Sequence, residues 1–312
     1  MLFCYPRRIM FEETMQLSHN DMIVPFQLEQ SALRGRLVRL GTTLDDILCK
    51  HQYPPPVARL VAEAATLACV LGSMLKEDGI FSLQAKGDGP VSLLVADYTA
   101  DGALRAYASF NNESLSTVPD RFCELLGTGY LSFTLDRGAG FERYQGIVEI
   151  DGDSLTKSAQ HYFLQSEQVH TEIKYFATAG GPPWQVAAVC IQAMPRTEDI
   201  GDHDLDRIPD GWDEMIALLH TLTPLEAMDT ALHPHDVLFR LFHEGGVRVH
   251  DTQHIQHRCR CGLARAEQAL ATLSEAEALE FSDDNIVEVK CEFCNSTYRF
   301  TLAEVAALRG AD

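Results

Sequence analysis

In several segments of the first 194 residues, hydrophobic and polar positions alternate with the two-residue period of a β-strand. Glycine- and aspartate-containing turns separate neighbouring segments, and such turns indicate β-hairpins. The pattern predicts strands within residues 33–40, 79–110, 129–153, 171–179 and 184–195. Because the strands come in hairpins rather than in strict alternation with helices, an α+β fold is favoured over a doubly wound parallel sheet.

Helical periodicity in the same region predicts helices over residues 44–51, 55–76 and 154–168. The second of these follows a proline-rich turn and is apolar enough to lie at the centre of the fold. In the third, Ser154 stands at the N-cap position. We therefore expect residues 25–194 to form a core domain of helices and mixed β-sheet, after a poorly structured extension at residues 1–24.

Residues 195–250 form a distinct acidic segment, with 4 basic and 12 acidic side chains and a formal charge of −8. Residues 197–211 are short of apolar side chains and are typical of a linker. The rest predicts short amphipathic helices, whose apolar positions are Trp212, Met215, Ile216, Leu218, Leu219, Val237, Leu238, Leu241 and Phe242. A short helix with one apolar face must bury that face or stay marginally stable, so we expect these helices to dock on the core domain.

The whole chain of 312 residues has 25 basic and 45 acidic side chains, a formal charge of −20. This excess argues against nucleic acid, whose phosphates require cationic patches, and against electrostatic docking on anionic lipid. No apolar run approaches the ~20 residues of a membrane span. The N-terminus lacks the apolar region of a secretory signal. We therefore expect a cytoplasmic protein that binds neither nucleic acid nor membranes.

Sequence motifs for nucleotide binding and hydrolysis are absent: there is no Gly-Lys-Ser/Thr phosphate loop and no HExxH, GxSxG or GxGxxG. The glycine-rich segment at residues 86–91 lies between predicted strands, which favours a turn. His233, His235 and Asp236 could ligate a metal, but a proline-flanked helix start explains them more simply. These absences predict a protein that is not an enzyme and uses no nucleotide.

The nine cysteines fall into two groups. Four form two close pairs near the C-terminus, Cys259 with Cys261 and Cys291 with Cys294, and 29 residues separate the pairs. The others are scattered singly, and free cysteine packs as a small hydrophobe. We expect structural or incidental roles for Cys4, Cys49, Cys69, Cys123 and Cys190. An odd number of cysteines suits a reducing compartment better than a secreted disulfide framework.

The two cysteine pairs supply four thiolates, the ligand set that suits a tetrahedral Zn²⁺. The second pair is a C-x-x-C motif followed by Asn295 and Ser296, a polar turn that lets backbone amides approach the sulfurs. The first pair is C-x-C, whose short spacing also allows a small, strained disulfide of the labile, regulatory kind. His254 and His257 lie just upstream and are surplus beside four thiols.

Residues 251–312 are predicted to fold as a small domain around these cysteines. A helix, a strand over residues 285–290 and two capping boxes, which begin at Ser274 and Thr301, surround the pairs. About sixty residues with so small a core need a cross-link, which a bound zinc ion would supply. From the residues alone the role stays open. A static zinc-ribbon adaptor and a thiol oxidoreductase that uses Cys291 and Cys294 are the alternatives, although the oxidoreductase lacks its usual βαβ context.

Beyond the cysteines, several segments resemble one family, the 33-kilodalton heat-shock proteins, which are redox-regulated holdase chaperones of the bacterial cytoplasm. The similarity extends over roughly residues 27–305. It is carried by the C-x-C and C-x-x-C pairs together with LRGRLVRL, YPPPVARLVAEAATLACVLGSMLK, LQAKGDGPVSLLV, GTGYLSFTL, ERYQGIVEIDGDSL, YFLQSEQV and VLFRLFHE, in the family's order. Departures from the pattern are the extra N-terminal residues and the five additional cysteines.

This resemblance implies a mechanism. Cys259, Cys261, Cys291 and Cys294 would bind one Zn²⁺ in the reduced state, and oxidation would join Cys259 to Cys261 and Cys291 to Cys294. Zinc would leave, the redox-switch domain at residues 251–312 would unfold, and the metastable linker at residues 195–250 would lose its neighbour and unfold too. The apolar linker face, with surface of the core domain, would then bind unfolding client proteins without ATP. We expect this face to comprise Trp212, Met215, Ile216, Leu219, Leu238, Leu241 and Phe242, and we expect the oxidised form to be a homodimer.

Overall fold

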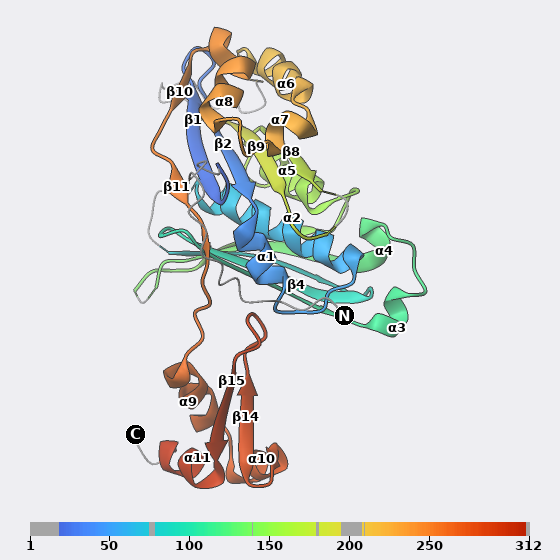
Figure 1. The fold of residues 1–312 in the computed structure, drawn as a ribbon, viewed down its shortest axis with the longest axis vertical. Helices are drawn as coiled ribbons and strands as arrows, with labels where there is room; N and C mark the ends of the chain where they lie inside the picture. Colours follow the sequence, from blue (N-terminus) through green and yellow to red (C-terminus); the bar gives the residue numbers. More distant parts are fainter. Residues whose placement is uncertain are drawn as a thin grey trace, which may run out of the picture. The chain divides into compact units, whose positions relative to one another are not determined.

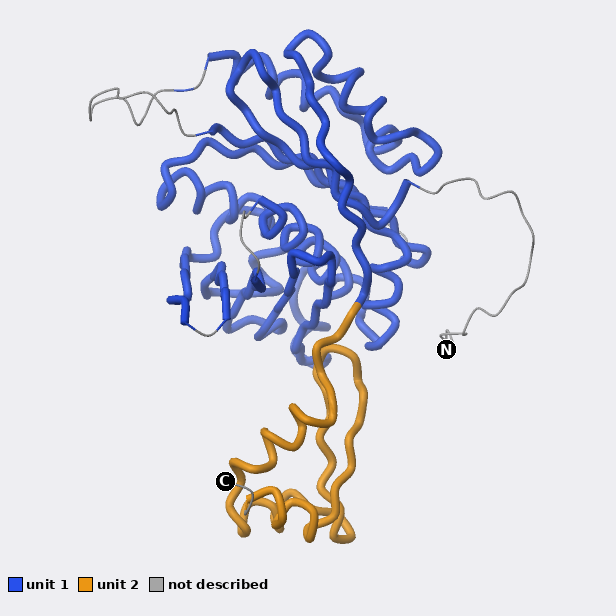
Figure 2. Tube along the Cα trace, turned by 90° about the vertical axis from the view of Figure 1, so that its left-hand side faces the viewer, with its two compact units in different colours: residues 1–257 blue, residues 258–312 orange. Residues whose placement is uncertain are grey.

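The computed structural model describes residues 19–74, 79–138, 140–178, 181–194, 208 and 210–309. The chain divides into two compact units, residues 1–257 and residues 258–312, which Figure 2 shows in different colours. Most of the acidic start of the linker, residues 195–207 and 209, lies outside the described residues, as do Cys4 and most of the expected N-terminal extension. The mixed helices and sheets confirm the α+β class.

The first unit contains two β-sheets, which we call sheet A and sheet B. Sheet A has the strand order β10-β1-β2-β9-β8, with β11 also paired to β1. Its strands are β1 (Met22–Leu28), β2 (Leu33–Leu40), β8 (Thr171–Ala177), β9 (Val186–Ala193), β10 (Val247–Val249) and β11 (Gln253–His254). All these pairings are antiparallel. Strand β1 therefore begins inside the segment that was expected to be an unstructured extension.

Sheet B has the strand order β12-β5-β4-β3-β6-β7. Its strands are β3 (Ile80–Gly87), β4 (Val91–Thr99), β5 (Ala103–Phe110), β6 (Gly129–Asp136), β7 (Tyr144–Glu149) and β12 (Gln256–His257). The predicted hairpins are confirmed, and the KGDGPV segment contains the β3–β4 turn. Two short helices, α3 (Asn112–Leu115) and α4 (Phe122–Leu126), connect β5 to β6.

Helix α2 (Pro55–Gly72) lies between the two sheets and contacts strands of both (Figure 1). It is long and apolar enough to span a membrane by length and composition alone, contrary to the expectation that no segment approaches a span. However, 78% of it is buried inside the structure, as in the core helix of a globular domain. Helices α1 (Thr42–Leu48) and α5 (Leu155–Gln165) pack beside it. Ser154 caps α5 as predicted, because its side chain accepts a hydrogen bond from the Lys157 amide.

The linker helices cover the opposite face of sheet A (Figure 1). They are α6 (Trp212–Thr221), α7 (Pro224–Met228) and α8 (Pro234–Phe242), and a 3₁₀ turn (His243–Gly245) leads from α8 to β10. His233 and Pro234 start α8 as the helix-start interpretation requires. The helices and the sheet share a buried cluster that includes Val24, Phe26 and Leu37. The helices therefore dock on the sheet of the core domain.

A short strap, residues 253–257, follows the linker and joins both sheets. Its first strand, β11, extends sheet A, and its second, β12, pairs in parallel with β5 at the edge of sheet B. Between them Ile255 is buried in the main core, and its backbone carbonyl accepts a hydrogen bond from the Thr43 hydroxyl. These residues were expected to belong to the redox-switch domain, but they pack with the first unit.

The second unit, residues 258–312, has a three-stranded sheet of order β13-β14-β15 with helices beside it. Its elements are α9 (Leu263–Ala271), α10 (Glu275–Glu280), β13 (Ser282–Asp283), β14 (Ile286–Lys290), β15 (Thr297–Thr301) and α11 (Leu302–Leu308). Both predicted capping boxes are confirmed, with Ser274 and Thr301 as the N-caps. Its buried core is one small cluster of Ala266, Leu270, Ala278, Val287, Phe300 and Val305.

Candidate metal centre and linker interface

The four paired cysteines come together in the second unit. Their sulfur atoms all lie within 4.8 Å of one another. Cys259 Sγ is 3.6 Å from Cys291 Sγ, and Cys261 Sγ is 3.3 Å from Cys294 Sγ. Residues more than thirty positions apart in sequence thus form one cluster, which could hold a metal ion.

The geometry of the cluster fits a four-sulfur metal site. A tetrahedral site with metal–sulfur bonds of about 2.3 Å places its sulfurs about 3.8 Å apart, close to the spacing of these thiols. Thiolate sulfur is the ligand that Zn²⁺ and other soft metals prefer. His254 belongs to β11 and His257 to β12 of the first unit, so four cysteines form the candidate ligand set without them.

The C-x-x-C motif forms a turn that is organised by backbone hydrogen bonds. Cys291 and Cys294 lie between β14 and β15, so neither stands at the helix N-terminus that a thiol oxidoreductase of the βαβ type would use. The Asn295 amide donates to the Cys291 carbonyl over 2.8 Å, and Asn295 takes a left-handed conformation with φ of 58°. The amides of Phe293 and Cys294 hydrogen-bond the Cys291 sulfur. The polar turn thus brings amides to the sulfur as predicted.

Neighbouring hydroxyl groups complete the surroundings of the sulfurs. The Tyr298 hydroxyl donates to Cys261 Sγ over 3.3 Å, and Ser296 Oγ lies 3.2 Å from Cys294 Sγ. Burial raises the pKa of Cys291 to about 12. Burial also acts to raise the pKa of Cys294, but the hydrogen bonds with Ser296, Cys261 and Cys259 together outweigh it and lower that pKa to about 6. Four close sulfurs repel one another as anions, and a divalent cation removes that penalty.

The remaining described cysteines lie away from the cluster. Cys69 and Cys190 are fully buried, and burial raises the pKa of both thiols, that of Cys190 to about 12. Such thiols are poor nucleophiles at neutral pH. Cys49 and Cys123 are exposed, on the first unit. These positions are compatible with the structural or incidental roles expected from the sequence.

All seven residues expected to bind clients lie in the interface between the linker helices and sheet A. Met215, Leu219, Leu238 and Phe242 are at most 2% exposed, and Trp212, Ile216 and Leu241 pack against them. The ring of Phe242 stacks on Phe26 of β1 with centroids 5.7 Å apart. The apolar stripe therefore covers, in this structure, an apolar sheet face that would otherwise be exposed.

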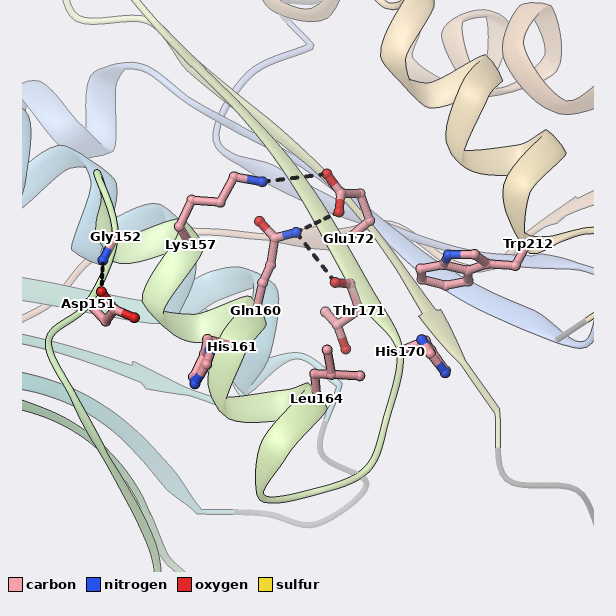
Figure 3. Close-up of a pocket in the computed structure, with 10 residues that line it drawn as sticks. All are labelled: Asp151, Gly152, Lys157, Gln160, His161, Leu164, His170, Thr171, Glu172 and Trp212. Atoms are coloured by element: carbon pink, nitrogen blue, oxygen red, sulfur yellow. Dashed lines mark hydrogen bonds and ion pairs between the residues drawn. The ribbon is translucent and has the colours of Figure 1, made fainter. Parts of the chain in front are cut away.

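Polar contacts hold the first linker helix over β8. The rings of Trp212 and His170 have their centroids 5.6 Å apart, and both residues line a pocket of about 440 Å³ between α5, β8 and α6 (Figure 3).

Glu172 in this pocket connects β8 to both neighbouring helices. Its carboxylate accepts a hydrogen bond from Gln160 Nε2 over 2.6 Å, and its Oε1 lies 3.5 Å from His220 Nε2 of α6. The Lys174 ammonium donates to two carbonyls at the end of the same helix, those of His220 and Leu222.

Arg39 of β2 makes a further polar contact with the linker, which no sequence motif indicates directly. Its guanidinium donates to the carbonyls of Glu226, Ala227 and Leu232. The alternation along the strand does indicate its position. Arg39 points to the same face of β2 as Leu33 and Leu37, so it places a cation on an otherwise apolar face. The identity of its partners depends on contacts across nearly 190 residues.

Fold and site together define a class of protein: an α+β body with docked amphipathic helices, joined to a small unit that is built around four thiols. The sequence model of one family, described as "Hsp33 protein", matches residues 21–301. The chain therefore belongs to the Hsp33 family.

Similar proteins share this family. A 33 kDa chaperonin of Caulobacter vibrioides (strain NA1000 / CB15N) is 37% identical over 290 residues, which covers 90% of this chain and 94% of the relative. A 33 kDa chaperonin of Pseudomonas syringae pv. syringae (strain B728a) is 35% identical over 290 residues, which covers 92% of this chain and 93% of the relative. The crystal structure of the 33 kDa chaperonin of Thermotoga maritima has the same fold, with a TM-score of 0.76, 21% identity, and coverage of 93% of this chain and 98% of that one. Membership of this family supports a chaperone role rather than an enzymatic one.

Proposed function

We propose that this chain is a redox-regulated, ATP-independent holdase chaperone whose switch is the four-cysteine cluster. The observation that carries the proposal is the convergence of four thiols within 4.8 Å in a unit whose own buried core is very small. Such a unit depends on a cross-link for its stability. Chemistry that removes the cross-link therefore also removes the fold of the unit.

In the reduced state, Cys259, Cys261, Cys291 and Cys294 would hold one Zn²⁺. The ion would keep the four sulfurs as thiolates, which are the form that reacts with oxidants, and would cross-link the two ends of the unit. The amides at Phe293 and Cys294 and the Tyr298 hydroxyl orient the sulfurs and offset part of their charge.

Oxidation would convert the four ligands into two disulfides, Cys259–Cys261 and Cys291–Cys294. For each disulfide, peroxide takes two electrons from two thiolates and, with two protons, is reduced to two molecules of water. A sulfur in a disulfide no longer carries the negative charge that makes a thiolate a strong zinc ligand, so the four-sulfur site is lost. Cys259 Sγ and Cys291 Sγ are 3.6 Å apart, and Cys261 Sγ and Cys294 Sγ are 3.3 Å apart, so the crossed pairing Cys259–Cys291 and Cys261–Cys294 is the alternative that mass spectrometry must test.

The strap at residues 253–257 would carry this change to the linker. It directly precedes the unit, and its two strands are two residues long, so they are the kind of element that opens locally. Unfolding of the unit would free the chain beyond His257, and fraying would pass from β12 through β11 to β10, which follows α8. The linker helices would then lose the anchor at their C-terminal end.

Release of the helices would expose the client-binding surface. It would consist of the linker residues Trp212, Met215, Ile216, Leu219, Leu238, Leu241 and Phe242, together with the face of sheet A that they cover. An apolar face of this kind binds unfolding proteins by burying their apolar side chains, without nucleotide. We further propose that the oxidised form is a homodimer, because pairing two chains enlarges the surface, and that the protein acts in the cytoplasm.

The test is to treat the reduced, zinc-loaded protein with hydrogen peroxide at mild heat. Zinc release, thiol count and suppression of the aggregation of a thermally unfolding client are followed together. We expect zinc release, loss of four thiols and gain of protection to coincide. Retention of zinc, or equal protection by the reduced and oxidised forms, would refute the proposal.

A matched variant separates the cluster from the other exposed cysteines. Cys49→Ser with Cys123→Ser removes two exposed thiols outside the cluster and should leave the response unchanged. Cys261→Ser removes one cluster ligand, so it should lower zinc affinity and abolish the redox dependence. If the Cys49 and Cys123 variant loses the response instead, the switch does not lie in the cluster.

A further inference from the structure

Arg39 is a buried cation at the centre of the linker interface. Only 1% of its surface is exposed, although it carries a charge. Its Nε atom donates to the Ala227 carbonyl over 2.8 Å, and its terminal nitrogens donate to the carbonyls of Leu232 and Glu226 over 2.7 and 3.2 Å. All three acceptors belong to the linker, so the side chain leaves sheet A and ends among linker backbone groups.

The acceptors of Arg39 are carbonyls that the linker cannot satisfy by itself. Glu226 and Ala227 lie in the last turn of α7, a five-residue helix, and the last carbonyls of a helix have no partner within it. Leu232 lies in the connection between α7 and α8. One guanidinium thus fixes the irregular middle of the linker, where no regular hydrogen bonding would hold the chain.

Burial of this charge is balanced by the linker. Burial lowers the pKa of Arg39 to about 10, so the side chain stays charged at neutral pH. Among the residues that the structure describes, no carboxylate lies within ion-pair distance of it; Asp229 of the linker acts on it from farther away. A buried cation without hydrogen bonds is strongly unfavourable, so the docked arrangement of α7 depends on this contact.

Lys174 makes a second contact of the same kind. From β8, its ammonium donates to the carbonyls of His220 and Leu222, over 2.6 and 2.8 Å, where α6 ends. Like Arg39, it binds backbone oxygens rather than acidic side chains. Two cations of sheet A therefore hold the C-terminal ends of the first two linker helices.

We propose that Arg39, assisted by Lys174, is the positioning residue that keeps the linker docked on sheet A and so holds the chaperone in its inactive state. The inference rests on the proposed function, because it assigns the regulation of the same surface. When the linker leaves, water hydrates both the guanidinium and the three carbonyls, so the contact stabilises the docked state only by the modest net free energy of its hydrogen bonds. The contact therefore favours the docked linker without preventing its complete release.

The test compares Arg39→Met with Arg36→Met in the reduced, zinc-loaded protein. Arg36 is on the same strand but the opposite face, where it donates to the carbonyls of Gly35 and Ser73, and both variants remove one positive charge. Hydrogen exchange is followed by mass spectrometry over residues 212–245. Loss of three charged hydrogen bonds should speed exchange in α7 and α8 by about 10- to 100-fold in the Arg39 variant, and Arg36→Met should leave these helices unchanged.

Two further readouts make the result decisive. Exchange in β9 and α2 reports whether the core remains folded, and zinc content reports whether the thiol unit is intact. Arg39→Lys keeps the positive charge but lacks the planar guanidinium that reaches three carbonyls at once. The hydrogen-exchange rate of its linker should therefore lie between those of the wild type and Arg39→Met. Unchanged exchange in Arg39→Met, or wild-type behaviour of Arg39→Lys beside a released Arg39→Met, overturns the three-carbonyl role.

Client protection separates this inference from the proposed function. If Arg39→Met releases the linker and the reduced protein now suppresses aggregation, both stand. If it releases the linker and no protection appears, Arg39 holds the linker but the uncovered face does not bind clients, and the proposed function fails alone. Protection by the reduced variant without faster linker exchange would overturn the inference while leaving client binding intact.

Discussion

The stacked pair of Phe242 and Phe26 gives a quantitative test of how firmly the linker is docked. Phe242 on α8 is fully buried, and its ring stacks on that of Phe26 with an interplanar angle of 17°. Replacement of a buried phenylalanine by alanine costs about 3–5 kcal/mol, since apolar area is lost and a cavity remains. The face of sheet A is fixed by its own strand pairing, so it cannot collapse into that cavity.

Because this loss occurs only where the helix is docked, Phe242→Ala should shift the docking equilibrium of the linker. At 1.4 kcal/mol per factor of ten, the open population should rise by a factor of about 10² to about 4 × 10³. Phe239 offers a matched control, since it lies on the same helix and is 62% exposed. Phe239→Ala should therefore leave docking almost unchanged.

The assay uses the distribution of the two tryptophans, Trp184 in the main core and Trp212 on the linker. In a Trp184→Phe background, fluorescence reports on the linker alone, and hydrogen exchange of α8 gives an independent measure. We expect Phe242→Ala to show a red-shifted emission and fast exchange in the reduced, zinc-loaded state. Equal behaviour of the Phe242 and Phe239 variants would contradict the view that apolar burial holds the linker.

Four further outcomes follow. Zinc removal by a chelator should make the amides of β14 and β15 exchange rapidly while α2 stays protected, because six buried side chains cannot hold the second unit; persistent protection would show that the unit is stable without metal. Thr301→Ala should destabilise the zinc-loaded second unit to urea by about 1 kcal/mol, and Thr301→Ser should not, since only alanine loses the capping oxygen. Glu63 accepts hydrogen bonds from the Thr156 amide and hydroxyl, and burial raises its pKa, so folding stability should fall as pH rises above about 4.5. Glu63→Gln should therefore be more stable than the wild type in urea unfolding at pH 8. A gain in stability that is equally large at pH 4 would contradict this reasoning. Neutralising the acidic linker residues should increase light scattering by oxidised client complexes, and unchanged scattering would argue against a solubilising role of the charge.

The elements that the sequence predicted well are those with local signals. Strand β2 alternates over its first five residues, α2 is a long apolar helix after prolines, and Ser274 and Thr301 match a capping motif that spans only four residues. Each depends on neighbours within one or two turns of chain. The cysteine pairs were equally readable, because the ligand demand of a soft metal fixes residue type and spacing before any tertiary structure is known.

The features that were missed depend on distant partners. Strand β1 is buried on both faces and contains Pro25, so it lacks the alternation that marks a half-buried strand. Strands β10, β11 and β12 are two or three residues long and exist only through their pairing with β1 and β5. No local pattern could place them, and the boundary expected at residue 251 therefore divided the chain before the strap rather than after it.

The linker combines an apolar docking face with a charged outer face, and this separation bears on its metastability. Every described acidic side chain of the linker is exposed, at positions 210, 213, 214, 226, 229, 236 and 244. None of them serves to bind Arg39 or Lys174, which hold backbone carbonyls instead. The acids therefore repel one another in the docked state, and this repulsion relaxes when the segment extends. Under the proposed function, burial of the apolar stripe and the carbonyl contacts of Arg39 and Lys174 would have to overcome that repulsion, so a modest loss at the strap would release the helices.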